Sequence, residues 1–247
     1  MSARNPGKKI IVDGIGKQFG SLAVVRDVSF DVSDGEFVAI VGPSGCGKST
    51  LLNIIAGFDR PSAGTVSING TVRSHPSRNG IMISQHGSVF PWLTVHENLM
   101  FALSATRHRD QADLAHRYID LVGLAGFEKA YPHELSGGML KRVELARALV
   151  VKPEILYMDE PFSALDALMS LKMQTELRRI LDEERHTVLL ITHDVEEAIF
   201  LADRILVLSP RPATIQTVFQ VDLPHPRKLS NSNAQALREA ILKELGL

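Results

Sequence analysis

The sequence holds a single cysteine among 247 residues, which excludes an intrachain disulfide and fits, without requiring, a reducing compartment. Its formal net charge is -1, so it lacks the basic excess typical of chains that bind nucleic-acid backbones. No apolar run approaches the roughly 20 residues that span a bilayer, and the polar first nine residues lack the apolar stretch of a secretory signal. We therefore expect a soluble chain that binds no nucleic acid and reaches a membrane only through a partner.

Short apolar runs rich in β-branched residues are the main secondary-structure signal. They lie at residues 37–41, 155–158, 188–191 and 205–208. Such continuous runs are typical of strands buried on both faces, and helical patterns separate them, which predicts a mainly parallel sheet covered by helices. The hydrophobic fraction of 45% and the charged fraction of 22% are those of a globular chain with a substantial core.

Three segments depart from this pattern. Around residues 65–73, alternating residues flank Asn69 and Gly70, which predicts an antiparallel hairpin with a two-residue turn. Residues 95–150 show a mostly helical pattern without a convincing strand. After residue 208, four prolines argue against long regular elements. A last helix is expected beyond them, capped by Asn233, with an apolar repeat every four residues at Leu237, Ile241 and Leu245.

A glycine-rich loop follows the first apolar run. Residues 42–49 fit the pattern G-x-x-x-x-G-K-[ST] completely, between a strand-like run and a helical stretch, which is the context that this phosphate-binding motif requires. Glycines let backbone N–H groups curl around an anion, and the following helix adds its positive N-terminal end. Lys48 is expected to reach the β- and γ-phosphates of ATP, and Ser49 to offer its hydroxyl to Mg²⁺. The predicted nucleotide-binding residues here are Gly42, Ser44, Gly45, Cys46, Gly47, Lys48, Ser49 and Thr50.

Cys46 lies inside this loop. A nucleophilic cysteine needs an activating partner, and no histidine lies near Cys46 in the sequence. We therefore interpret it as a small filling side chain.

Two carboxylates end the run at 155–158. Residues at the carboxyl end of a parallel strand face the ligand crevice. Asp159 suits the shell of Mg²⁺, and Glu160 suits a general base that polarises the attacking water. An ordinary acidic strand end is the alternative, which the upstream phosphate loop disfavours. His193 follows the run at 188–191 and is placed to donate a hydrogen bond to a γ-phosphate, whereas we interpret the other eight histidines as structural or exposed.

These residues together resemble one family, the ATP-binding cassette (ABC) proteins. The decisive stretch is Leu-Ser-Gly-Gly-Met at residues 135–139, followed by residues 141–148, which looks like the LSGGQ signature of that family. The other matches, in family order over residues 10–208, are Phe19 for the aromatic residue that stacks on adenine, Gln85 for the Q-loop glutamine, Asp166 in the D-loop-like segment 163–166, and His193 for the switch histidine.

The resemblance implies an ATPase that works in pairs. In the family, two copies meet head to tail, so Ser136, Gly137 and Gly138 would open a helix over 139–150 and contact the ATP of the partner copy. ATP binding would favour the closed dimer, and hydrolysis would release it. The expected catalytic residues are Glu160, His193 and Gln85, and the expected Mg²⁺ ligands are Ser49, Gln85 and Asp159.

The resemblance also implies an architecture. The expected fold class is α/β, with a phosphate-loop (RecA-like), mainly parallel sheet core, an antiparallel β subdomain and an inserted helical subdomain. We expect one ABC ATPase domain over residues 1–247. Its α/β core would comprise 8–90 and 151–210, its helical subdomain 91–150, and its tail and last helix 211–247.

Some residues resemble the branch that serves nitrate, sulfonate and taurine importers. They are Met139, in place of the usual glutamine, and the segments 89–95 and 209–212. The resemblance implies transmembrane permease subunits as partners, a substrate-binding protein as an indirect one, and a peripheral place on the cytoplasmic face of the inner membrane. Phe90, Trp92 and Leu93 would line the groove that receives a permease helix, and ordinary core aromatics remain an equal alternative.

Other functions compete with an importer ATPase. A GTPase would need a guanine-reading N-K-x-D motif, which is absent, and neither a GTPase nor a phosphate-loop kinase explains the signature at 136–138. An ABC exporter ATPase remains open. So does a non-transport ABC ATPase, although such proteins usually carry two cassettes or a long coiled coil.

Overall fold

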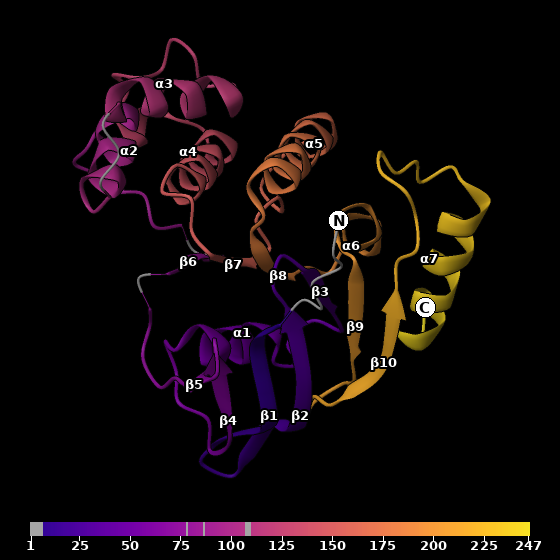
Figure 1. The fold of residues 1–247 in the computed structure, drawn as a ribbon. Helices are drawn as coiled ribbons and strands as arrows, with labels where there is room; N and C mark the ends of the chain where they lie inside the picture. The colour runs from indigo at the N-terminus through magenta and orange to yellow at the C-terminus, as the bar shows by residue number, and fades with distance from the viewer. Residues whose placement is uncertain (1–6, 78, 86, 107–109) are drawn as a thin grey trace. The chain divides into compact units, whose positions relative to one another are not determined.

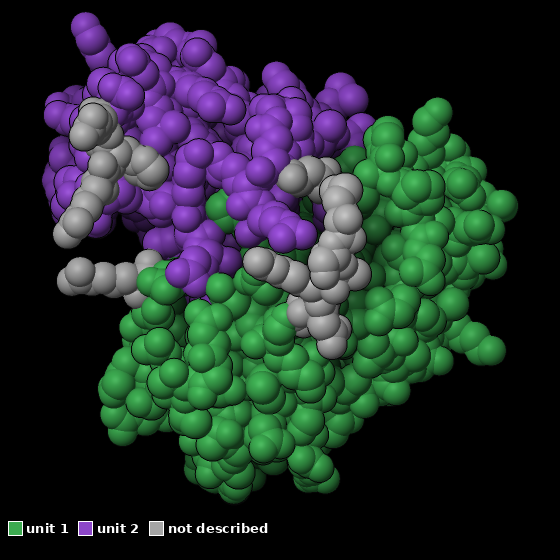
Figure 2. Space-filling view, in the orientation of Figure 1, with its two compact units in different colours: residues 1–80, 186–247 green, residues 81–185 purple. Residues whose placement is uncertain are grey.

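The chain divides into two compact units, which Figure 2 shows in separate colours. Unit 1 comprises Met1–Gly80 and His186–Leu247, and unit 2 comprises Ile81–Arg185. The computed structural model describes residues 7–77, 79–85, 87–106 and 110–247. Among the helices of these ranges, none has the length and apolar character that crossing a membrane requires.

Three parallel strands form the buried centre of unit 1. β3 (Phe37–Val41) lies between β8 (Thr187–Ile191) and β9 (Arg204–Leu208) and runs parallel to both. Every residue of β3 and β8 is buried, which explains their continuous apolar sequences. The predicted strands are thus confirmed to within one residue. α1 (Lys48–Ala56) contacts β8, and α6 (Val195–Leu201) contacts β3.

A second, antiparallel sheet of unit 1 has the strand order β2-β1-β4-β5. Its strands are β1 (Lys8–Phe19), β2 (Leu22–Ser33), β4 (Ala63–Ile68) and β5 (Thr71–Val72). The predicted hairpin joins β4 to β5. Asn69 and Gly70 have φ angles of 51° and 73°, the left-handed geometry that a two-residue hairpin turn needs, so this prediction is confirmed.

The tail of unit 1 contains a strand that the sequence interpretation missed. β10 (Ile215–Gln220) pairs antiparallel with β9. The pairing is possible because the four prolines lie outside β10, so its backbone N–H groups remain available. The last helix is present as α7 (Ser232–Glu244), and it contacts α6 (Figure 1). The predicted cap at Asn233 is wrong. The helix begins earlier, so the Asn231 side chain is the cap and accepts a hydrogen bond from the Asn233 N–H at 2.9 Å.

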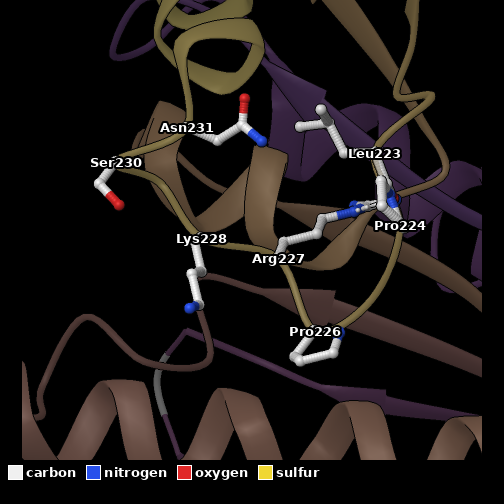
Figure 3. Close-up of a pocket in the computed structure, with 7 residues that line it drawn as sticks. All are labelled: Leu223, Pro224, Pro226, Arg227, Lys228, Ser230 and Asn231. Atoms are coloured by element: carbon white, nitrogen blue, oxygen red, sulfur yellow. Dashed lines mark hydrogen bonds between the residues drawn. The ribbon is translucent and has the colours of Figure 1, made fainter.

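A buried arginine ties this tail to α6. The Arg227 guanidinium, 7% exposed, donates to the carbonyl oxygens of Ile199 and Ala202 at the end of the helix, and to that of Leu223 in its own loop. Figure 3 shows the side chain reaching from its loop toward Leu223 and Pro224, beside a depression of about 320 Å³. A cation at a helix C-terminus satisfies carbonyls that lack intrahelical partners, so Arg227 fixes where the tail leaves the sheet.

Unit 2 is mostly helical. It contains α2 (Val95–Ser104), α3 (Gln111–Leu121), a short 3₁₀ turn (Pro132–Glu134), α4 (Gly137–Leu149) and α5 (Ala167–Glu184). Two strands, β6 (Gly80–Ile83) and β7 (Ile155–Asp159), are neighbours in a sheet. α2 begins with a capping box between Thr94 and Glu97. α4 starts two residues before the predicted 139–150, because Ser136 caps it and the two glycines form its first turn.

Candidate functional site

The phosphate loop of unit 1 connects the buried strand β3 to the N-terminus of α1. Lys48 is the first residue of α1 and is 7% exposed. Its Nζ donates hydrogen bonds to the carbonyl oxygens of Gly42 at 2.8 Å and Pro43 at 3.0 Å, so the ammonium lies inside the curl of the loop. Ser44 and Gly45 are exposed at its rim, and Ser49 and Thr50 continue the first turn of the helix. The arrangement presents a cation and helix N–H groups at one place.

Two glycines of this loop have positive φ angles, but the space around them differs. Gly47 has φ 122°, and a Cβ atom there would lie 2.8 Å from Cγ1 of the buried Val24. Gly45 has φ 72°, but a Cβ atom would meet its nearest neighbour, Nη2 of Arg211, at 3.6 Å. The loop therefore packs directly on β2 at Gly47, whereas Gly45 has room.

Cys46 and Arg211 hold the loop from two sides. The Cys46 side chain is 2% exposed, and its N–H donates to the Pro43 carbonyl at 3.3 Å, which agrees with a filling role. The Arg211 guanidinium donates to the Gly45 carbonyl through Nε at 3.1 Å and through Nη2. Sequence analysis did not single out Arg211 as part of the loop.

His193 is exposed between β8 and α6 in unit 1. The next residue, Asp194, caps α6 by accepting from the N–H groups of Glu196 and Glu197. The position of His193 at the carboxyl end of a buried strand is therefore as predicted. A depression of about 320 Å³ adjoins it, lined by His193, Asp194, Val195, Glu196, Arg238 and Leu242.

Phe19 lies at the end of β1 and is 52% exposed. The Lys17 ammonium lies 4.7 Å from the centroid of its ring, within the range of a cation–π contact. Lys17 also pairs with Asp59 at 2.7 Å. An exposed, supported aromatic ring of this kind suits stacking on a base.

The two carboxylates predicted in unit 2 differ in environment. Asp159 ends β7 and is 4% exposed. Glu160 follows with φ 49°, a left-handed conformation that is uncommon for a non-glycine residue and that clusters at functional sites. Gln85 Nε2 donates to Glu160 Oε2 at 3.4 Å, so the structure brings together two of the residues predicted to be catalytic.

The signature segment forms the N-terminus of α4. The Ser136 side chain accepts a hydrogen bond from the Met139 N–H at 3.3 Å, and Ser136 and Gly137 are exposed. A Cβ atom on Gly138 would lie 3.3 Å from the Ala164 carbonyl, so the signature packs against the D-loop-like segment. Asp166 in that segment caps α5. The N–H groups of Gly137 and Gly138, in the first turn of α4, lack intrahelical partners, and the helix end at Ser136 and Gly137 is exposed.

The donor set predicted for Mg²⁺ fits that ion chemically. Ser49, Gln85 and Asp159 supply a hydroxyl, an amide oxygen and a carboxylate, which are the hard oxygen ligands that Mg²⁺ takes. Such sites typically combine one or two carboxylates with substrate phosphates. Asp159 is only 4% exposed, and a buried carboxylate of this kind suits coordination of Mg²⁺.

Sequence analysis missed a polar cluster beside Gln85. Lys141, Glu144 and Arg147 on α4 contact Ser84 and Ser88, which flank Gln85 in sequence. Burial lowers the pKa of the Arg147 guanidinium, and the Glu144 carboxylate opposes that shift. The only sequence signal was the three-residue spacing of the charges, which places them on one helix face.

The chain is similar to known proteins in sequence. A family model described as ABC transporter matches residues 25–163. The chain is 42% identical to the aliphatic sulfonates import ATP-binding protein SsuB of Bacillus cereus, over 92% of this chain and 90% of that protein. It is 46% identical to the nitrate import ATP-binding protein NrtD of Synechocystis, over 85% of this chain and 79% of that protein.

Solved structures show the same fold. The ATP-binding cassette MJ0796, in a dimeric post-hydrolysis state bound to ADP and Pi, superposes with a TM-score of 0.75. It is 28% identical in sequence, and the match covers 86% of this chain and 98% of that one.

Proposed function

This chain belongs to the ABC transporter family, and on that premise we propose that it is the ATPase subunit that powers import of a solute of the nitrate, sulfonate or taurine type. ATP binding and hydrolysis are the activity of the family. The import direction and the solute class are supported by the names of the relatives, which are sulfonate and nitrate import proteins. The α/β fold with a phosphate-loop core agrees with this assignment.

One observation carries the proposal. The chain has two helix N-termini suited to phosphate, α1 behind the loop at 42–47 and α4 behind Ser136. The first suffices to hold the chain's own ATP. The second is explained if it serves the ATP of another copy in a head-to-tail dimer, and the relative MJ0796 is dimeric.

Each predicted residue then has a part in the reaction. Lys48 neutralises the β- and γ-phosphates, Phe19 stacks on adenine, and Glu160 accepts a proton from the attacking water while Gln85 orients it. His193 donates a hydrogen bond to the γ-phosphate. Ser49, Gln85 and Asp159 would hold Mg²⁺, which would neutralise phosphate charge. Ser136, Gly137, Gly138 and Asp166 meet the nucleotide across the dimer.

Dimerisation links ATP to transport. A nucleotide that binds the closed pair more tightly than the open one shifts the equilibrium toward closure by its differential affinity. Cleavage of the γ-phosphate removes that difference, and the pair reopens. Permease subunits attached to both copies convert this cycle into alternating access, with a substrate-binding protein delivering the solute.

An exposed aromatic surface supports the permease contact. Trp92 is 69% exposed and Phe101 56%, and both rings lie beside Phe90, at centroid distances of 5.5 Å and 4.7 Å. Exposure of this size disfavours a core role for Trp92 and suits a groove that receives an apolar helix face. Leu93 belongs to the same segment. With such a contact, the chain would lie peripherally on the cytoplasmic face of the inner membrane.

The domain plan follows the same proposal. One ABC ATPase domain spans residues 1–247, with an α/β core at 8–90 and 151–210. Residues 91–150 form the helical subdomain that carries the signature, and 211–247 the tail and last helix. The helices α2, α3 and α4 within 95–149 support this division.

Two variants test the ATPase assignment. Glu160→Gln is expected to retain ATP binding, accumulate as an ATP-bound dimer and lose nearly all turnover, because the general base is gone. Lys48→Ala is expected to weaken ATP binding itself. Phosphate release and equilibrium binding of a fluorescent ATP analogue measure both effects. Hydrolysis by Glu160→Gln at the parental rate would refute the base assignment.

Co-purification tests the transport assignment. A tagged chain expressed in its own cells is expected to recover a membrane-embedded permease. Recovery only with ribosomes or DNA would favour the non-transport ABC ATPase instead. Export rather than import would show as ATP-dependent loss of solute from loaded vesicles, which would favour the exporter alternative.

A further inference from the structure

One face of α4 carries a row of charged residues that point away from solvent. Lys141 and Glu144 are 6% and 2% exposed, and their side chains form an ion pair of 2.9 Å. Arg147 follows one helical turn later and is half-buried. Charged side chains are rarely buried to this extent unless they have specific partners, and a buried ion pair is a weak source of stability. A contribution to stability therefore does not explain why these charged residues are buried.

All three charges bind the segment that carries Gln85. Lys141 Nζ donates to the Ser84 carbonyl at 2.6 Å, immediately before Gln85. The Ser88 hydroxyl, three residues after Gln85, donates to Glu144 Oε1 at 2.7 Å and accepts from Arg147 Nη2. The two carboxylate oxygens of Glu144 thus have different partners: Oε2 pairs with Lys141, and Oε1 accepts the hydrogen bond from Ser88. Gln85 is fastened on both sides to the helix that begins at the signature.

Gln85 itself is exposed and depends on this fastening. Its described contact is the bond from Nε2 to Glu160 Oε2, at 3.4 Å near the upper limit of a hydrogen bond. A bond of that length is easily lost if the backbone of Gln85 shifts. Charge-assisted hydrogen bonds to the flanking residues are stronger and more directional, so they set where the Gln85 side chain lies.

We propose that Lys141, Glu144 and Arg147 form a clamp on α4 that positions Gln85 against Glu160 for hydrolysis. The three are positioning residues, since they act through Gln85. The proposal rests on the proposed function, because it assigns the clamp a part in ATP turnover. Arg147 extends the clamp to the aromatic surface, where its guanidinium lies 4.9 Å from the Phe90 ring centroid.

A volume-matched double variant separates positioning from packing. Lys141→Met with Glu144→Leu keeps apolar bulk in the buried space, and apolar replacement of a buried ion pair is often neutral for stability. It cannot bind the Ser84 carbonyl or the Ser88 hydroxyl. We expect kcat to fall about ten- to hundredfold, as small misplacements of catalytic groups do, with the Kd for ATP unchanged within about twofold.

Two further variants complete the test. Arg179→Gln with Glu183→Gln removes an equal pair of charges from an exposed ion pair on α5, and serves as the matched control with parental kcat. Ser88→Ala removes the hydroxyl that Glu144 and Arg147 share, and the smaller alanine side chain creates no steric clash at this exposed residue. Its kcat is expected to fall severalfold with parental ATP affinity.

Amide hydrogen exchange gives a readout that needs no turnover. The N–H groups of residues 87–90 are expected to exchange faster in the double variant and in Ser88→Ala, and at the parental rate in the control. Parental kcat in Ser88→Ala, or parental exchange in both clamp variants, would overturn the proposal, even if the double variant fails to fold. A parental chain without ATPase activity would instead count against the proposed function, while hydrogen exchange would still decide whether the clamp exists.

Discussion

Substitution of Gly47 by alanine probes the phosphate loop most sharply. The φ angle of 122° at Gly47 is one that side-chain-bearing residues rarely adopt, and the added Cβ would lie 2.8 Å from Val24 Cγ1 and 3.1 Å from the Val24 carbonyl oxygen. Val24 is 5% exposed, so its side chain has little freedom to yield. Gly45→Ala is the matched control, because its left-handed φ of 72° is combined with only an ordinary contact, 3.6 Å from the added Cβ to Arg211 Nη2.

The two substitutions should differ in magnitude. An alanine in the left-handed region at residue 45 costs about 1–2 kcal/mol. At residue 47 the backbone strain is about 1–3 kcal/mol, and forcing a methyl group against a packed neighbour adds roughly 1–3 kcal/mol. The combined loss of ATP-binding and unfolding free energy should therefore be about 2 kcal/mol larger for Gly47→Ala than for Gly45→Ala. This equals roughly a thirtyfold difference in an equilibrium constant.

Both ATP affinity and unfolding must be measured. If the apo loop relaxes, the strain appears as weaker ATP binding, and if it does not, the strain lowers the free energy of unfolding. Titration with a fluorescent ATP analogue measures the loss of binding free energy, and urea unfolding measures the loss of stability. The sum of these two losses is the quantity to compare. A sum for Gly47→Ala equal to or below that for Gly45→Ala would refute the packing of the loop on Val24.

Three other predictions address single contacts. Alkylation of Cys46 should block nucleotide binding, because the thiol is buried within the loop, and bound ATP should slow the labelling; equal labelling rates with and without ATP would contradict this placement. Arg227→Met should lower the free energy of unfolding by about 2–4 kcal/mol, because buried carbonyls lose their donor, whereas Arg238→Met, at an exposed ion pair, should cost under about 1 kcal/mol. The hydrogen bond from Lys17 lowers the pKa of Asp59 below its ordinary value of 3.8. Its contribution to stability is therefore present above that value and lost as the pH falls through the folded pKa, so Asp59→Asn should show a shallower loss of stability in acid urea titrations.

The core strands and the motifs were predictable because their signals are local. A strand buried on both faces must be apolar throughout, so β3 and β7 stand out in the sequence. Asn69 and Gly70 are the residue types that a two-residue hairpin turn favours, so the turn can be predicted from them alone. The phosphate loop needs its residues at fixed spacing along one segment. These features require no knowledge of distant contacts.

What the sequence did not reveal depends on long-range contacts. β10 is specified by its pairing with β9 rather than by the prolines around it. Asn231 and Asn233 are equally good capping residues, and only the start of α7 decides between them. The contact between Gln85 and Glu160 joins residues 75 positions apart, and the clamp on α4 joins segments more than 50 apart. No local periodicity encodes such pairs.

The central claim is that each copy completes the ATP site of the other through Ser136. Sedimentation of the Glu160→Gln chain with ATP, with and without the added substitution Ser136→Glu, tests this most directly. We expect ATP to convert Glu160→Gln into a dimer, and the added Ser136→Glu to leave a monomer that still binds ATP with parental affinity through its own phosphate loop. An ATP-dependent dimer that persists with Ser136→Glu would contradict it.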